Sequence, residues 1–319
     1  MVDPRTSQLE EILRFRVRKF LRGQKWGQEL QSTLNYLEAH GCSAYIVGGV
    51  LRDLMTHGDS AKPRDIDIVF DGTPPDKVEY LLWNHSRRKN RFGGLHLKVR
   101  DCDFDMWSLR DTWAFRNRKV SQVGISQLPQ TTFLNIDAIV LKLEKNGEDR
   151  IYSHGFFEAL SNRTLEINLE ENPFPETCLV RSLLLASKLQ FDVGPRLARY
   201  IALHSRKMSL QELERVQKAH YGSVEFDVAD FQGCFRRIRR ELSKSKDSPI
   251  SLPQRQFKLG EKPHARQEVG GFESWFSKCG EMLFVQSHPI RKLQRLLQRK
   301  ERSFLFTYND QPQWLRKAP

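Results

Sequence analysis

The stretch AYIVGGVLRDLMTHGDSAKPRDIDIVF, residues 44–70, decides the fold of the first half of the chain. An apolar run at 44–47 predicts a β-strand, and the glycines that follow it open a short helix. A second strand is predicted over 65–70, where Asp65 and Asp67 alternate with apolar residues. A strand, a helix and a strand in such a short segment indicate a domain that mixes helices with a sheet.

The segments around this stretch extend the same pattern. The other predicted strands are 95–99, 104–109 and 136–144. The predicted helices of this half of the chain are 7–21, 26–39 and 74–86. Asn146-Gly147 predicts a two-residue hairpin after the last of these strands. We therefore predict an α+β head with a mixed β-sheet that ends near residue 170.

Beyond residue 170 only helical patterns remain. The predicted helices are 175–191, 195–205, 209–222, 227–244, 272–283 and 288–302. The polar, proline-containing segment 244–268 is interpreted as a linker or long loop. The predicted organisation is an N-terminal helical extension at 1–41, a head domain at 42–170 and an all-helical body at 171–319.

Composition limits the classes of protein to which the chain can belong. No apolar run approaches the about 20 residues that span a bilayer, and the polar N-terminus does not resemble a secretory signal. The five cysteines are scattered without close pairs, which favours reduced, buried thiols and a cytoplasmic location. The net charge of +13 favours polyanionic partners. Neither histidine nor cysteine spacing suggests a metal site, so metal binding would fall to carboxylates.

The Gly-Gly junction is a candidate anion site. A strand that ends in glycine and opens into a helix presents free backbone N–H groups and the positive end of the helix. Gly48 and Gly49 stand at this point, and the Arg52 guanidinium could make a forked contact with phosphate oxygens. The alternative is an ordinary tight turn.

Aspartates on the predicted strands form a candidate metal site. Asp65 and Asp67 are two residues apart on a strand, so their carboxylates share a face. Asp105 lies on another predicted strand, and three carboxylates from neighbouring strands could hold two Mg²⁺ ions. The alternative is a strand edge that faces solvent. His96 is interpreted as a structural residue of its strand.

Three motifs in order, GGVLRD, RDIDI and FDMWSLR, resemble the catalytic head of a known family. It is the tRNA nucleotidyltransferase/poly(A) polymerase family, in its class II (bacterial-type) branch of the DNA polymerase beta superfamily. The resemblance implies a polymerase-beta-like nucleotidyltransferase head that uses Mg²⁺ and an NTP. It also implies roles for particular residues: triphosphate binding by Gly48 and Gly49, metal binding by Asp65, Asp67 and Asp105, and loop stabilisation or nucleotide contact by Arg52 and Asp53.

Two later segments depart from the pattern of this family. The segment QTTFLNIDAIV, 130–140, lacks the family's Arg-Asp pair, and its Asp137 stands where the family often has Asn. The segment 175–191 retains Arg181, which is assigned to nucleotide binding, but Glu176 is followed by neither the Asp nor the Arg of the family's base-reading helix. The resemblance therefore implies the transfer reaction without the usual base selection.

Two basic stripes in the predicted body are candidates for RNA binding. Arginines repeat at helical spacing within 235–242 and 291–302, and such a stripe suits a phosphate backbone. The alternative for each stripe is a solvated helix face. The assigned residues are Arg236, Arg237, Arg239, Arg240, Arg291, Arg295 and Arg299.

Taken together, these features predict a Mg²⁺-dependent nucleotidyltransferase. It would transfer a nucleoside monophosphate from an NTP (ATP or CTP) to the 3′ hydroxyl of an RNA. The first candidate for this RNA is tRNA. Two alternatives stay open: a nucleotidyltransferase that modifies a protein or small molecule, as a toxin-like or defence enzyme would, and a non-catalytic RNA-binding protein that reuses the fold.

Overall fold

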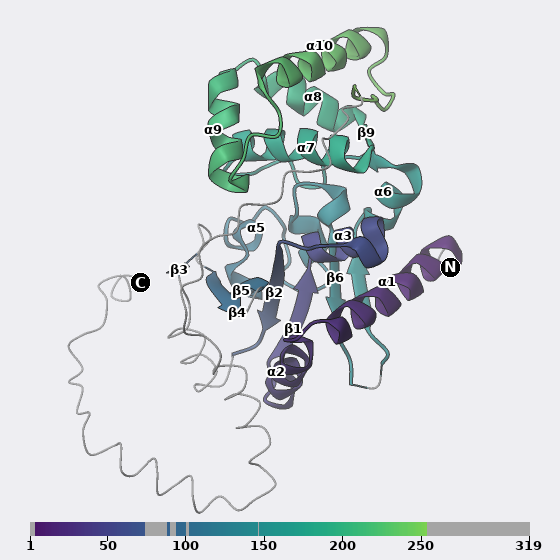
Figure 1. The fold of residues 1–319 in the computed structure, drawn as a ribbon, viewed down its shortest axis with the longest axis vertical. Coiled ribbons are helices and arrows are strands. Elements are labelled where there is room, and N and C mark those ends of the chain that lie inside the picture. The colour runs from purple at the N-terminus through teal and green to yellow at the C-terminus, as the bar shows by residue number, and fades with distance from the viewer. Residues whose placement is uncertain (1–3, 74–87, 90–93, 100–101, 146, 254–319) are drawn as a thin grey trace, which may run out of the picture.

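The structure is a computed structural model that describes residues 4–73, 88–89, 94–99, 102–145 and 147–253 (Figure 1). Its α-helices are α1 (Pro4–Gly23), α2 (Gly27–Ala39), α3 (Gly49–His57), α5 (Trp113–Arg116), α6 (Phe156–Asn162), α7 (Pro175–Leu189), α8 (Pro195–His204), α9 (Leu210–Tyr221) and α10 (Val228–Lys244). Its strands are β1 (Ser43–Val47), β2 (Asp65–Asp71), β3 (Arg88–Lys89), β4 (Leu95–Val99), β5 (Cys102–Ser108), β6 (Ile139–Lys142), β7 (Arg150–Ser153), β8 (Thr164–Leu165) and β9 (Asp192–Val193). Short 3-10 turns are η1 (Gly58–Ser60), η2 (Leu109–Asp111), η3 (Leu128–Thr131) and η4 (Asn135–Asp137).

A mixed sheet of seven described strands forms the head, in the order β3-β4-β5-β2-β1-β6-β7. The central pair β2 and β5 is parallel, and the neighbouring pairs are antiparallel. The alternation that predicted β2 is visible in the burial of its side chains. Ile66 and Ile68 are buried, whereas Asp65 and Asp67, which alternate with them, are partly exposed. The predicted mixed sheet is therefore confirmed.

The two N-terminal helices pack onto the sheet. On α1, Leu13, Val17 and Leu21 are buried in the same hydrophobic core as the strands. The Trp26 ring, just before α2, meets the Phe104 ring of β5 edge-on, with 5.3 Å between ring centroids. The predicted helical extension thus shares its core with the sheet.

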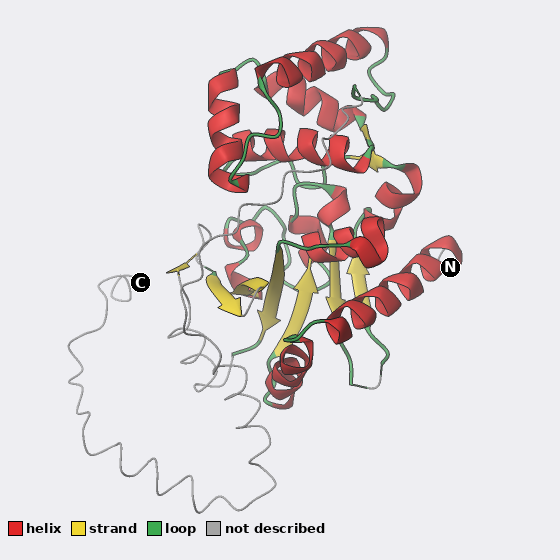
Figure 2. Ribbon diagram, viewed as in Figure 1, coloured by secondary structure: helices red, strands yellow, loops and turns green. Residues whose placement is uncertain are grey.

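Four helices, α7 to α10, gather at the other end of the molecule from α2, as Figure 2 shows. They correspond to the four helices predicted between 175 and 244. N-cap residues explain where two of these helices begin. The Ser209 hydroxyl accepts a hydrogen bond from Glu212 N at the start of α9, and Asp227 forms a capping box with Asp230 at the start of α10. Strand β9 interrupts this region briefly and pairs in parallel with β8.

The structure corrects one local prediction. Strands β6 and β7 do form an antiparallel hairpin, but β6 ends at Lys142 and β7 begins at Arg150, so the connection is longer than a two-residue turn. The reason is Asp149, whose carboxylate accepts from Glu144 N and bonds to Arg18 of α1, which holds the longer loop in place. The helix α6 had no counterpart among the predicted elements.

Some predictions lie outside the described residues, namely the helices at 74–86, 272–283 and 288–302. Among the helices that the structure describes, none combines the length and apolar character needed to cross a membrane. The cysteines in the described ranges, Cys42, Cys102, Cys178 and Cys234, are buried, and none of these four is in a disulfide.

Candidate functional site

The parallel pair β2 and β5 brings the predicted carboxylates together. Asp65 is in register with Asp103, and Asp67 with Asp105. Each strand alternates, so its apolar residues enter the core while its aspartates share the opposite face. The three residues predicted to meet, Asp65, Asp67 and Asp105, therefore lie on one face of adjacent strands, and Asp103 of β5 joins them.

The neighbouring carboxylates contribute to a raised pKa of Asp67. Burial first, and then the charges of Asp65 and Asp105, raise the pKa of Asp67 to about 8. The charges of Arg181 and Arg64 oppose this rise only in part. Such a cluster of carboxylates with excess negative charge is the oxygen donor set that Mg²⁺ prefers.

As they stand, the carboxylates are engaged by neighbouring side chains. Asp65 Oδ2 accepts from Arg64 Nη2 at 2.7 Å, and Asp105 Oδ1 lies 2.9 Å from His96 Nδ1. Across the ranges that the structure describes, no three His, Cys, Asp or Glu side chains are grouped so that they could hold a metal ion. The donor chemistry thus fits Mg²⁺, but the side chains would have to turn from Arg64 and His96 to hold it.

His96 was interpreted from the sequence as a structural residue, and the structure places it in the carboxylate cluster. It stands opposite Asp105 in the antiparallel register of β4 and β5. Besides its contact with Asp105, its Nε2 atom lies 3.4 Å from Asp103 Oδ1. Only the pairing of β4 with β5 reveals this position, because nothing in the local pattern distinguishes His96.

The Gly-Gly junction adopts the predicted strand-to-helix turn. Gly48 has φ +65° and ψ −120°, a conformation that residues with a Cβ rarely adopt, and Gly49 is the first residue of α3. The Gly48 N–H donates to the Ile139 carbonyl at 3.0 Å, so it belongs to the sheet. A phosphate at this junction would meet the N–H groups of the first turn of α3.

The structure places Arg52 differently from the prediction of a forked phosphate contact. Its side chain is only 10% exposed, and its guanidinium bonds to two carboxylates. Nε and Nη2 contact Asp53 Oδ1 at 2.9 and 2.8 Å, and Nη1 donates to Asp137 Oδ1. Arg52 thus connects α3 to the η4 turn through Asp137, and Asp53 contacts Arg52 within the same helix.

Asp137 also binds Arg181, which the sequence assigned to nucleotide binding. Arg181 Nε and Nη2 donate to Asp137 Oδ2 at 3.1 and 2.8 Å. Arg181 belongs to α7, so this contact joins the helical lobe, α7 to α10, to the head. The sequence assigned Asp137 no role, since its two partners are far away in the chain.

The predicted basic stripe is present on α10. Arg236, Arg239 and Arg240 are exposed and Arg237 is partly exposed. Some of this charge is compensated: Arg237, Arg240 and Lys244 all contact the Glu241 carboxylate. Figure 1 places α10 at the far end of the helical lobe from β2 and β5. The other predicted arginines, Arg291, Arg295 and Arg299, lie outside the described residues.

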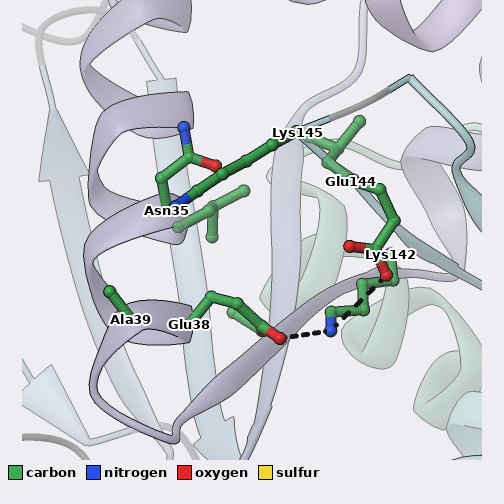
Figure 3. Close-up of a pocket in the computed structure, with 9 residues that line it drawn as sticks. Asn35, Glu38, Ala39, Lys142, Glu144 and Lys145 are labelled. Atoms are coloured by element: carbon green, nitrogen blue, oxygen red, sulfur yellow. Dashed lines mark hydrogen bonds and ion pairs between the residues drawn. The ribbon is translucent and has the colours of Figure 1, made fainter.

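A separate pocket lies between α2 and the end of β6 (Figure 3). The buried Lys142 ammonium donates to Glu38 Oε1 at 2.7 Å in this pocket. Burial alone would lower the pKa of Lys142, but the contact with Glu38 outweighs it and the pKa is raised. None of the predicted site residues lines this pocket.

Comparison with known proteins identifies the segment that carries the carboxylates. The sequence model of the family "Poly A polymerase head domain" matches residues 44–139. Residues 44–139 are thus similar to that head domain, and the resemblance seen in the motifs is confirmed. Among curated proteins, none matches the chain.

Several solved structures are similar to the chain. A tRNA nucleotidyltransferase complexed with a primer tRNA and an incoming ATP analog is 18% identical, with a TM-score of 0.47 over 65% of this chain and 60% of its own. A CCA-adding enzyme with ATP is 16% identical, with a TM-score of 0.47 over 70% and 52%. The Thermotoga maritima CCA-adding enzyme complexed with tRNA is 17% identical, with a TM-score of 0.47 over 73% and 62%. The chain thus spans less than two thirds of the length of each.

Proposed function

We propose that this chain, which carries a poly(A) polymerase head domain, is a nucleotidyltransferase that moves a nucleoside monophosphate from an NTP to an RNA 3′ hydroxyl. The observation that carries the proposal is the in-register pairing of Asp67 with Asp105, beside Asp65, within that head domain. Carboxylates that lie close together repel one another. A protein that only binds RNA has little use for such a cluster, whereas phosphoryl transfer needs it to hold metal ions.

In this proposal the aspartates hold two Mg²⁺ ions, which would activate the attacking hydroxyl and neutralise charge on the leaving pyrophosphate. Asp65 and Asp67 supply the oxygens nearest the triphosphate. Asp105, whose Oδ1 lies 2.9 Å from His96 Nδ1 in the structure, would turn from His96 and take the proton of the acceptor 3′ hydroxyl on a carboxylate oxygen.

The nucleotide site in this proposal is built on α3 and α7. The first turn of α3, after Gly48 and Gly49, offers N–H groups to the triphosphate. Arg52 and Asp53 keep that helix in place, and Arg181 contributes a guanidinium from α7. Both ATP and CTP are candidates, because the departures in 175–191 leave the base selection open.

The acceptor in this proposal is RNA, with tRNA as its first candidate. The net charge of +13 and the exposed arginines on α10 support a phosphate backbone as partner. We accordingly propose that the head at 42–170 performs the transfer, with the extension 1–41 packed on it, and that the body at 171–319 holds the RNA.

The test is to incubate the protein with Mg²⁺, each labelled NTP in turn and total cellular RNA, and to separate RNA from protein on a gel. We expect label on RNA of tRNA size, lost on chelation of Mg²⁺ and in an Asp65→Ala variant that stays folded. Retained labelling by folded Asp65→Ala would contradict the proposed role of the carboxylates.

The same gel separates the rival functions. Label on protein in place of RNA would favour a nucleotidyltransferase that modifies proteins, which the departures around Arg181 allow. RNA binding without Mg²⁺ and without nucleotide consumption would favour a binding protein. The contacts of Asp65 with Arg64 and of Asp105 with His96 support this alternative, because they occupy the carboxylates that would otherwise hold a metal ion.

A further inference from the structure

A single buried carboxylate binds two arginines that come from distant parts of the chain. Asp137 is 8% exposed and lies in the turn η4, just before β6. Its Oδ1 accepts from Arg52 Nη1, and its Oδ2 accepts from Arg181 Nε and Nη2. Each carboxylate oxygen therefore serves a different guanidinium.

The three residues Arg52, Asp137 and Arg181 form a bridge that lies beside the Gly-Gly junction. A Cβ on Gly48 would come within 3.9 Å of the Asp137 carbonyl oxygen, so the η4 turn lies beside the start of α3. Arg52 approaches Asp137 from α3, and Arg181 approaches it from α7 in the helical lobe. Asp137 thus connects the element proposed to bind the triphosphate with the lobe above it.

The charge on Asp137 is stable at neutral pH. Burial alone would raise its pKa, but the charges of Arg181 and Arg52 together outweigh burial and the pKa lies below its ordinary value. In return, the charge of Asp137 raises the pKa of Arg181. An ionised carboxylate between two guanidinium groups is therefore the resting state of this bridge.

The two arginines differ in how far they are exposed. The Arg52 side chain is 10% exposed, whereas that of Arg181 is 31% exposed. Because Asp137 engages Nε and Nη2 of Arg181, the planar guanidinium directs Nη1 away from the carboxylate. The Arg181 charge also lowers the pKa of Asp67, against the rise caused by burial and by the neighbouring carboxylates.

We propose that Asp137 is a positioning residue for the nucleotide site: it holds the Arg181 guanidinium so that its Nη1 edge faces the NTP, and it holds α3 through Arg52. This inference rests on the proposed function, since it assumes that an NTP occupies the space beside Asp67. The ligand group it concerns is an acceptor oxygen or nitrogen of the nucleotide.

Asparagine at this position cannot replace the carboxylate. Its amide has one oxygen to accept a hydrogen bond, and its nitrogen would turn N–H donors toward the second guanidinium. Asp137→Asn therefore keeps the size of the side chain but releases one arginine. Asp137→Glu keeps the negative charge and both carboxylate oxygens, but its side chain is one methylene longer.

The experiment compares NTP binding and transfer kinetics of the wild type, Asp137→Asn and Asp137→Glu. We expect Asp137→Asn to weaken NTP binding and raise KM by about 10- to 100-fold, with a smaller fall in kcat, because Arg181 no longer presents a charge-assisted hydrogen bond to the ligand. Asp137→Glu should recover part of the affinity. In an Arg181→Gln background, Asp137→Asn should weaken binding little further.

Asp149→Asn is the matched control for a purely structural effect. Asp149 is also buried and also holds an arginine, Arg18, but it lies in the β6–β7 loop against α1. Both variants should lose thermal stability, and only Asp137→Asn should lose NTP affinity. Unchanged NTP affinity in Asp137→Asn, or an equal loss in Asp149→Asn, would overturn the inference.

The outcomes also separate this inference from the proposed function. A wild type that binds NTP and transfers nucleotide, with unchanged affinity in Asp137→Asn, contradicts the inference alone. A wild type that neither binds NTP nor transfers nucleotide contradicts both.

Discussion

Asp67 and Asp105 lie directly opposite each other on the parallel strands β2 and β5, at the centre of the sheet. Their side chains share a face with Asp65, and the repulsion among them contributes to the raised pKa of Asp67. A divalent cation would relieve this repulsion. Removing the charge of Asp67 should therefore change both the transfer reaction and the pH dependence of stability.

Replacing Asp67 by Asn should abolish transfer while preserving the fold. Removing a metal-binding carboxylate costs about 3 kcal/mol or more of transition-state stabilisation, which corresponds to about 100-fold or more in rate. Single-turnover transfer with labelled NTP, together with circular dichroism, provides the measurement. A folded Asp67→Asn variant with wild-type transfer would show that this carboxylate is not part of the reaction.

Stability without divalent cations should fall as pH rises. The pKa of Asp67 is about 8 in the folded protein against an ordinary 3.8, so between these values the folded state holds a proton that the unfolded chain has released. Stability is therefore lost as pH rises through this window. Urea unfolding at about pH 5 and about pH 9 should show this fall in the wild type and a smaller fall in Asp67→Asn. Parallel pH profiles for the two proteins would contradict the prediction.

Gly48→Ala should destabilise the strand-to-helix junction. Alanine at φ +65° and ψ −120° carries a backbone strain of about 1–3 kcal/mol. Gly49→Ala is the control for stability, because its Cβ would lie an ordinary 3.5 Å from Arg52 Nη2. Urea unfolding of both variants tests the difference, and equal losses of stability would mean that the positive φ of Gly48 is not required.

The N-terminal helix should behave as part of the head. Leu13 of α1 is fully buried against the core, so Leu13→Ala should lower the free energy of unfolding by about 2–5 kcal/mol. Phe15 on the same helix is 62% exposed, and Phe15→Ala should change it by about 0.5 kcal/mol or less. Thermal unfolding measures both. A helix that only extends from the head would give two equally small effects.

The arginines of α10 should contribute to RNA affinity through phosphate contacts. The double variant Arg236→Ala/Arg240→Ala should weaken RNA binding and reduce the slope of log affinity against log salt by about 2, one for each arginine removed. The control Lys145→Ala/Arg150→Ala removes the same charge from the β6–β7 loop and the first residue of β7, where both residues are exposed. Filter binding across a salt series provides the slopes, and equal changes in both variants would assign the affinity to net charge alone.

The local patterns of the sequence predicted most of the sheet and the described helices. Alternation along β2 placed Asp65 and Asp67 on one face, because the side chains of a strand alternate regardless of what surrounds it. Asp105 shares that face through the parallel register of β2 and β5. The described helices between 175 and 244 followed from their apolar spacing, which reflects the period of the helix itself. The loop between β6 and β7 escaped prediction because Asp149 and Arg18, which hold it, are far apart in the chain.

The sequence by itself determined most of the elements and the face that Asp65 and Asp67 share on their strand. Only the tertiary structure placed His96 beside Asp105, since that contact depends on the register of β4 against β5. It also brought Asp137 to Arg52 and Arg181, which lie 85 and 44 residues away along the chain. No local periodicity encodes such contacts, because they arise where separate elements pack against one another.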